Sequence, residues 1–229
     1  MAETEKGKDT KQKIVNSAKK LFYEQGYEAT TVMQITKDAE VNNGLFTYYF
    51  GSKIALAGMI STQFRLDMRN CVSQKMYIRY RNYNLALGIA VEQRKSVEMI
   101  LSDDKLLRFD IEQGMDINKA GNIRTDDEKM DGHQRSHFYQ LQKRLINPSI
   151  TDIDLKFYEV VGIAANRAMY SAYHGGFLKC TPEYMGDYII RLCFHLLQLP
   201  AGEIEELVEK SREIAKNIDV CVEPYFRVS

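Results

Sequence analysis

The chain has 229 residues, of which 45% are hydrophobic, so it can form a buried core in one large or two small domains. Its 31 basic and 31 acidic residues balance, which provides no overall attraction to nucleic acid. No apolar run reaches the roughly 18 residues of a membrane-spanning helix, and the first residues lack the apolar segment of a signal peptide. We therefore expect a cytoplasmic protein without a membrane partner.

The first predicted element is an amphipathic helix that ends at Gly26. Its apolar side chains recur at positions i, i+4, i+7 and i+8, namely Ile14, Ala18, Leu21 and Phe22. Glycine is typical of the position just after a helix, where the backbone often turns left-handed.

A short helix is then predicted to begin after Thr31. Thr31 and Gln34 have the spacing of a capping box, in which each side chain binds the other residue's backbone N–H. Apolar side chains follow at helical spacing, at Val32, Ile35 and Ala39. The pattern indicates a short helix followed by a tight turn.

A second short helix follows this turn and ends at Gly51. Either Asn42 or Asn43 can cap its start, because a short amide side chain satisfies a free backbone N–H. The rings of Phe46 and Phe50 are expected to face inward, which leaves a set of residues pointing outward: Asn43, Gly44, Thr47 and Tyr48. Two short helices joined in this way are typical of a helix-turn-helix that presents its second helix to the major groove of DNA.

The stretch that contains these elements, residues 11–56, resembles the N-terminal domain of the tetracycline-repressor (TetR) family of bacterial transcriptional regulators. The motifs that carry the resemblance are LFYEQGYEATTV, ITKDAEV and GLFTYYFGSK. The resemblance implies an all-α fold, with a helix-turn-helix DNA-binding domain in residues 1–53 and a helical ligand-binding and dimerisation domain in residues 54–229. It also implies a homodimer, most simply a repressor, that binds a palindromic double-stranded DNA operator and is released by a small-molecule effector.

The resemblance also assigns roles to single positions. The family's phosphate-contacting positions are occupied here by Thr31, Tyr49 and Lys53. Met33 stands at a base-contacting position, where it departs from the family's usual polar or charged residue. Among the outward residues, Asn43 can pair with an adenine edge, Thr47 can contact a thymine methyl group, and Gly44 allows close approach of the backbone.

The rest of the chain is predicted to be helical. The expected helices cover residues 52–70, 84–102, 104–118, 133–146, 152–177, 182–198 and 202–217. Residues 76–83 alternate in a β-prone manner, but no partner strand is visible, so we interpret them as helix or loop. The polar segment 119–132 is predicted to be a mobile loop.

Helices within residues 152–198 are the expected dimer interface. The segment 182–198 is apolar nearly all round, so it must be covered on all sides. The two helices resemble the family's dimerisation pair, in which two helices from each subunit form a four-helix bundle. The alternative is that they form the core of a monomer.

The middle of the chain is rich in aromatic residues and methionine, a composition that suits a pocket for an apolar or aromatic effector. Asn166, Arg167 and His174 interrupt an apolar helix and could anchor such a ligand. The candidate ligand-binding residues are Phe109, Phe138, Asn166, Arg167, Tyr170 and His174.

No catalytic constellation stands out, and no cofactor is predicted. His133 and His137 have a spacing that could hold a metal, although a surface pair is the simpler interpretation. The cysteines at 71, 180, 193 and 221 lack CxxC spacing and are expected to be free thiols, with a redox-sensing pair as the alternative. The other class of function left open is a small-molecule-binding helical protein, or an enzyme, that merely retains a helix-turn-helix fold.

Overall fold

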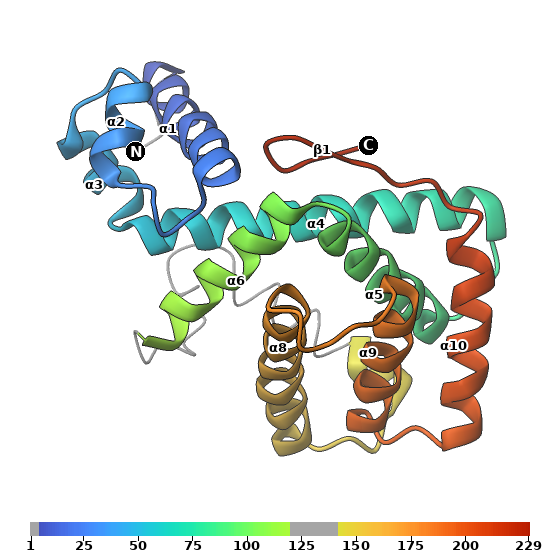
Figure 1. Ribbon diagram of the computed structural model, residues 1–229. Helices are drawn as coiled ribbons and strands as arrows, with labels where there is room; N and C mark the ends of the chain where they lie inside the picture. The colour runs from blue at the N-terminus through green and yellow to red at the C-terminus, as the bar shows by residue number, and fades with distance from the viewer. Residues whose placement is uncertain (1–4, 120–141) are drawn as a thin grey trace.

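The computed structural model describes residues 5–119 and 142–229, and these are almost entirely helical, as predicted (Figure 1). The helices are α1 (Glu5–Gln25), α2 (Val32–Asp38), α3 (Asn43–Phe50), α4 (Lys53–Tyr80), α5 (Leu85–Leu101), α6 (Asp104–Lys119), α8 (Asp152–His174), α9 (Pro182–Leu196) and α10 (Ala201–Ala215). Residues 142–146 are also helical. An antiparallel pair, β1 (Val222–Glu223) and β2 (Arg227–Val228), is the only sheet in the part of the chain described.

The helices form two groups that share the long helix α4 (Figure 1). Helices α1–α3, here called the N-terminal bundle, pack around the first turns of α4. Helix α5 packs along the remainder of α4, α9 and α10 pack on α5, and α8 packs on α9; with α6 these helices are here called the body. Helix α6 lies between the groups, because it contacts α1 as well as α4, α5 and α8.

The local signals for the short helices have the expected physical basis. The capping box is present, since the Gln34 amide N–H donates to the Thr31 hydroxyl at 3.2 Å and the Thr31 amide N–H donates to Gln34 Oε1 at 2.8 Å. Asn42, not Asn43, caps α3, with its side chain accepting from the Leu45 amide at 2.9 Å. Gly51 follows α3 with φ of 70°, a conformation that favours glycine.

Residues 76–80 show how packing decides what the local pattern left open. Residues 76–80 continue α4 as helix, with Met76 buried while Tyr77 and Ile78 are exposed, so their β-prone alternation is overridden. The expected loop at 119–132 and the first part of the helix expected at 133–146 lie outside the described residues, apart from Lys119 at the end of α6.

Helix α9 is covered mainly by its own chain, because α5, α8 and α10 all pack on it. Ile190 and Leu197 are completely buried, whereas Tyr184 and Tyr188 are exposed. A buried ion pair fixes this packing: Arg94 of α5 donates to Asp187 of α9 at 2.6 Å and to the backbone oxygen of Val208 in α10 at 3.1 Å. None of the described helices is long and apolar enough to cross a membrane.

Candidate functional site

The outward face of α3 is the first candidate site. Asn43, Gly44, Thr47 and Tyr48 are exposed, as their spacing predicted, while Phe46 between them is 1% exposed and anchors α3 in the core. Tyr48 is 80% exposed, so nearly all of its ring and hydroxyl can contact a ligand. The structure thus presents one amide, one aliphatic hydroxyl and one phenol ring on two turns of a helix.

Internal hydrogen bonds restrict what these side chains can offer to a ligand. The Thr36 hydroxyl of α2 donates to Asn43 Oδ1 at 2.5 Å, so the Asn43 NH₂ group is the part of this amide that can donate outward. The Thr47 hydroxyl donates to the Asn43 backbone oxygen at 3.2 Å, which leaves its methyl group exposed. Asn43 therefore has a second function, because it ties the two helices of the motif together.

The neighbouring predicted residues surround this face. Met33, in the first turn of α2, is 70% exposed, and Thr31 is exposed with its hydroxyl engaged in the capping box. Tyr49 is half-buried, with its ring edge-on to Tyr48 at 5.1 Å between centroids. A ring held in this way has little freedom, so Tyr49 can present its hydroxyl in a defined direction.

Lys53 has a structural role that the sequence did not indicate. Its ammonium group donates to the backbone oxygens of Tyr27 and Thr30, at 2.9 Å each, and lies 4.2 Å from the centre of the Tyr27 ring. These contacts hold the start of α4 against the turn between α1 and α2. An ammonium group has three protons, so one remains available to a phosphate.

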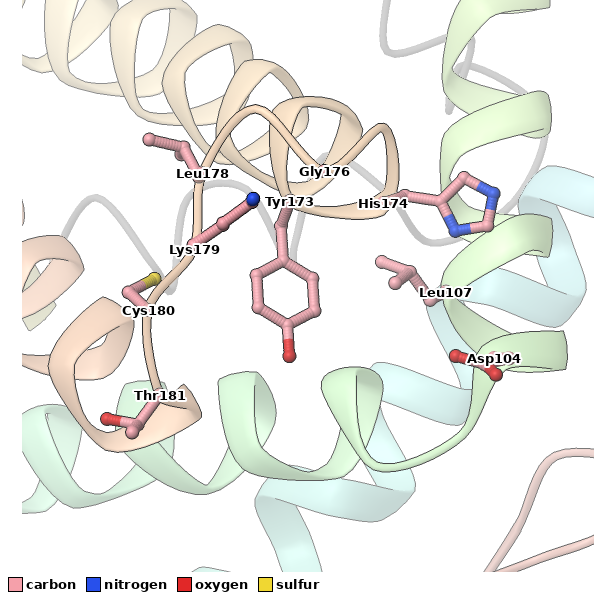
Figure 2. A pocket seen from close by; sticks show the side chains of 9 residues that line it. All are labelled: Asp104, Leu107, Tyr173, His174, Gly176, Leu178, Lys179, Cys180 and Thr181. Atoms are coloured by element: carbon pink, nitrogen blue, oxygen red, sulfur yellow. The ribbon is translucent and has the colours of Figure 1, made fainter.

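A second candidate site is an open pocket of about 570 Å³ between the first turns of α6 and the end of α8 (Figure 2). It is lined by Asp104, Leu107, Tyr173, His174, Gly176, Leu178, Lys179, Cys180 and Thr181. The Tyr173 ring points into its centre, and His174 stands at one side (Figure 2). Of the described residues predicted to bind a ligand, His174 is the one that lines this pocket.

The other predicted ligand residues lie elsewhere. Phe109 is 3% exposed and packs against Phe22 of α1, with 5.6 Å between ring centroids. Tyr170 is 3% exposed in the core of the body, and this burial raises the pKa of its hydroxyl well above the usual range. Phe138 lies outside the described residues, as do His133 and His137.

Arg167 and Asn166 are half-buried on α8. The Arg167 guanidinium covers Gly114 of α6 so closely that a β-carbon there would lie 3.0 Å from Arg167 Nε. Burial lowers the pKa of Arg167, and the carboxylate of Asp110 opposes that effect. Arg167 thus connects α8 to α6 next to the Arg65–Asp110 ion pair. The described residues form no cluster of His, Cys, Asp and Glu that could hold a metal ion.

A buried polar cluster in the body escaped the sequence reasoning. The Tyr158 hydroxyl lies 2.8 Å from Cys193 Sγ, and Lys143 Nζ lies 5.2 Å from the centre of the Tyr158 ring. Lys143 is 7% exposed, and burial lowers the pKa of its amine while raising the pKa of the Cys193 thiol. A thiol with a raised pKa is a weak nucleophile, which does not favour a redox sensor at Cys193. Helical periodicity could not find this cluster, because its members come from three separate elements.

Helix α6 joins the pocket to the N-terminal bundle. Asp104 and Leu107 line the pocket, and the next residue, Arg108, donates to the backbone oxygens of Tyr23 and Glu24 at the end of α1, at 3.1 Å each. The Tyr23 hydroxyl donates to Asp103, at the start of α6, at 2.7 Å. Burial, followed by this hydrogen bond, raises the pKa of Tyr23 to about 12. A displacement of α6 would therefore strain or break these hydrogen bonds and so change the position of α1.

Comparison with known proteins identifies the N-terminal part of the chain. Residues 14–58 match the family model described as bacterial regulatory proteins, tetR family. The chain is 47% identical over 45 residues to the HTH-type transcriptional regulator HbdR of Aromatoleum sp. (strain CIB), which is 20% of each chain. It is 33% identical over 66 residues to the HTH-type transcriptional repressor DhaR of Mycobacterium sp. (strain GP1), which is 29% of this chain and 33% of that one.

The matches to these curated relatives span between a fifth and a third of their lengths. Among solved structures, full-length TylP, a TetR regulator from Streptomyces fradiae, aligns over 93% of this chain and 97% of its own, with 19% identity and a TM-score of 0.47. The matched family and the curated relatives are transcriptional regulators, not enzymes. Residues 14–58 therefore form a helix-turn-helix domain that matches the tetR family of bacterial regulatory proteins.

Proposed function

We propose that the protein is a ligand-responsive transcriptional regulator, most simply a repressor, that binds a palindromic operator as a homodimer in the cytoplasm. Residues 1–53 would form the DNA-binding domain and residues 54–229 the ligand-binding and dimerisation domain. The observation that carries the proposal is the exposed face of α3, with Asn43, Thr47 and Tyr48, in a segment that matches the family model. The exposed face of α3 favours this function over the alternative of an enzyme or a ligand carrier, neither of which needs such a face.

The proposed dimer interface is the outer face of α8 together with α9. Exposed apolar side chains recur along α8 with helical spacing: Ile153, Phe157, Val160 and Val161. Tyr184 and Tyr188 of α9 are also more than half exposed. A contiguous apolar surface of this kind is costly in water, so a second subunit is the expected cover.

The proposed effector site is the pocket beside Tyr173 and His174. Its volume of about 570 Å³ lies within the usual range for small-molecule sites. The Tyr173 and Leu107 side chains suit an apolar or aromatic compound, and His174 provides a polar anchor. An effector releases DNA only if it binds the non-DNA conformation more tightly, and α6 offers the physical link through Arg108.

Selection of binding sites from random duplex DNA tests the proposed function directly. We expect enrichment of an inverted repeat, because a two-fold symmetric dimer reads two equivalent half-sites. Sequencing of the retained DNA checks this outcome. Recovery of no enriched sequence, at low as well as moderate salt, would refute the proposal.

Thr47→Ala should lower the preference for the selected operator. Loss of a base contact costs about 1–3 kcal/mol of discrimination, while phosphate contacts remain. Fluorescence anisotropy on the operator and on random DNA measures the two affinities. Lys37→Ala, which removes an exposed side chain of α2 outside the proposed contacts, is the control. Equal weakening on both DNAs would show that Thr47 does not read bases.

Lys53→Ala should weaken binding to all DNA and reduce the slope of log K against log salt by about one, because a phosphate contact releases a counterion. It should also lower the melting temperature, since Tyr27 and Thr30 lose a hydrogen-bond donor. Anisotropy at several salt concentrations and thermal melting separate the effects. A lower melting temperature with an unchanged slope would leave Lys53 with a structural role alone.

Phe157→Glu should convert the dimer to a folded monomer, because burying an unpaired carboxylate at the interface costs several kcal/mol. Sedimentation velocity measures the mass, and circular dichroism measures the helix content. Ile190→Glu is the contrasting variant: Ile190 is fully buried within its own subunit, so this change should unfold the protein. If the unmutated protein sediments as a monomer at micromolar concentration, the proposed interface is wrong.

An effector found by thermal-shift screening of apolar and aromatic compounds should also release the operator. At a free concentration one hundred times its Kd, the effector should stabilise the folded protein by about 2.7 kcal/mol. This stabilisation should be lost in Tyr173→Ala. Phe177→Ala, in an adjacent residue that is 86% exposed and does not line the pocket, should retain it. Equal stabilisation of both variants would place the effector elsewhere.

A further inference from the structure

The segment after α10 returns along α4 to the N-terminal bundle (Figure 1). The ammonium group of Lys75 in α4 holds the backbone oxygen of Asp219 at the start of this return. The chain then forms the β1–β2 hairpin, which is closed by two backbone hydrogen bonds between Cys221 and Ser229, at 2.9 and 3.0 Å. The hairpin therefore has a defined geometry and is tied to the helix that links the bundle to the body.

The tip of this hairpin inserts an aromatic ring where three helices meet. Phe226 is 1% exposed. Its ring centroid lies 4.7 Å from that of Phe109 in α6, 5.8 Å from Phe64 in α4 and 6.1 Å from Tyr23 in α1. One side chain thus contacts the N-terminal bundle, the linking helix and the body. Tyr225 adds a second contact, edge-on to the Tyr23 ring at 5.5 Å.

The backbone at the tip is strained in order to place these rings. Tyr225 and Phe226 have φ values of 64° and 61°, in the left-handed region that bulky side chains rarely adopt. Such conformations persist where the surrounding structure compensates for them, and they concentrate at positions with a function. Here the compensation is the burial of the Phe226 ring.

Apart from the Phe109 ring, which also packs on Phe22 at 5.6 Å, the contacts between α6 and the end of α1 are polar and partly exposed. They include the Arg108 hydrogen bonds to the end of α1 and the Lys105–Glu24 ion pair. Just after α1, the Glu28 amide donates to Glu112 at 2.9 Å. Exposed ion pairs and hydrogen bonds contribute little individually, because water competes for both partners. The aromatic contacts are thus the part of this junction that resists rotation, and Phe226 joins the Phe109 ring to the Tyr23 and Phe64 rings, which Phe22 does not do.

We infer that the β1–β2 hairpin is a positioning element for DNA reading, with Phe226 as the residue that fixes the angle between the N-terminal bundle and the body. In a dimer, this angle sets the distance and rotation between the two α3 helices. The inference rests on the proposed function, because it requires an operator with two half-sites. Phe226 itself would touch neither DNA nor effector.

Such a residue controls how strongly the affinity for DNA depends on the spacing between the two half-sites. Each base pair inserted between half-sites moves one of them by about 3.4 Å and rotates it by roughly a tenth of a turn. A rigid bundle cannot follow this change and loses contacts. A bundle that is free to swing about the start of α4 follows it at little cost.

The experiment uses the full chain and the operator that the unmutated protein selects from random DNA. Affinity is measured on this operator and on versions with one base pair inserted or removed between half-sites. We expect the unmutated protein to lose at least about tenfold in affinity, equivalent to about 1.4 kcal/mol, when the spacing changes. Phe226→Ala should reduce this penalty to less than about threefold, and Phe226→Leu should give an intermediate penalty, since it keeps an apolar but smaller side chain in place.

Glu223→Ala is the matched control, because Glu223 is an exposed residue of the same hairpin and should leave the spacing penalty unchanged. Circular dichroism and thermal melting establish that each variant is folded, and if Phe226→Ala does not fold, Phe226→Leu decides the question. An unchanged penalty in a folded Phe226 variant that still binds the operator overturns the inference and leaves the proposed function intact. Failure of the unmutated protein to select an operator overturns both.

Discussion

The aromatic junction between α1 and α6 is the contact on which the rest of the arrangement depends. The Phe109 ring lies 5.6 Å from that of Phe22 and 4.7 Å from that of Phe226, so α1, α6 and the hairpin are joined through the Phe109 ring. Burial of several aromatic side chains provides a large apolar contribution that does not weaken with salt. The Lys53 ammonium also holds the turn between α1 and α2. The orientation of α3 relative to the body therefore depends on contacts from α4, α6 and the hairpin as well as on the N-terminal bundle.

Helix α6 participates in this junction and also forms one wall of the open pocket. Leu107 lines the pocket, Arg108 binds the end of α1, and Phe109 packs into the aromatic junction, so three consecutive residues face three different parts of the molecule. Successive side chains on a helix diverge by about 100°, which makes such a division of contacts possible. Any compound that binds preferentially when α6 has shifted would change the orientation of the N-terminal bundle.

Helices α5, α9 and α10 form the part of the body relative to which α6 would shift. Arg94 lies buried between α5, α9 and α10, where Asp187, Ser211 and backbone oxygens use its donors. Removing one partner of such a buried pair is costly, so these three helices are expected to move as one unit. The apolar side chains on the inner side of α9, such as Ile190, are buried in this packing. The outer face of α8 is not covered by these helices. Ile190 is thus internal to the subunit, whereas Phe157 on α8 is 60% exposed.

By itself, the sequence determined the elements that depend on neighbouring residues. The capping box at Thr31, the stop at Gly51 and the outward set Asn43, Thr47 and Tyr48 follow from contacts within four positions, and the structure contains all of them. A motif of this kind also carries the resemblance to the family, which the match over residues 14–58 confirms. The choice of Asn42 over Asn43 as the cap needed the structure, since Asn43 is held instead by Thr36.

Contacts between distant segments were decided only by the tertiary structure. Composition correctly indicated an aromatic-rich middle, but it could not assign Phe109 to a junction with α1 and Tyr173 to a pocket, because both are aromatic residues on helices. Lys53 matched a phosphate-contacting position, and its bonds to Tyr27 and Thr30 became visible only when α4 was placed against α1. The hairpin around Phe226 is too short to give a periodic signal. Its position depends on burial among rings that lie more than a hundred residues away in sequence, and no local rule contains that information.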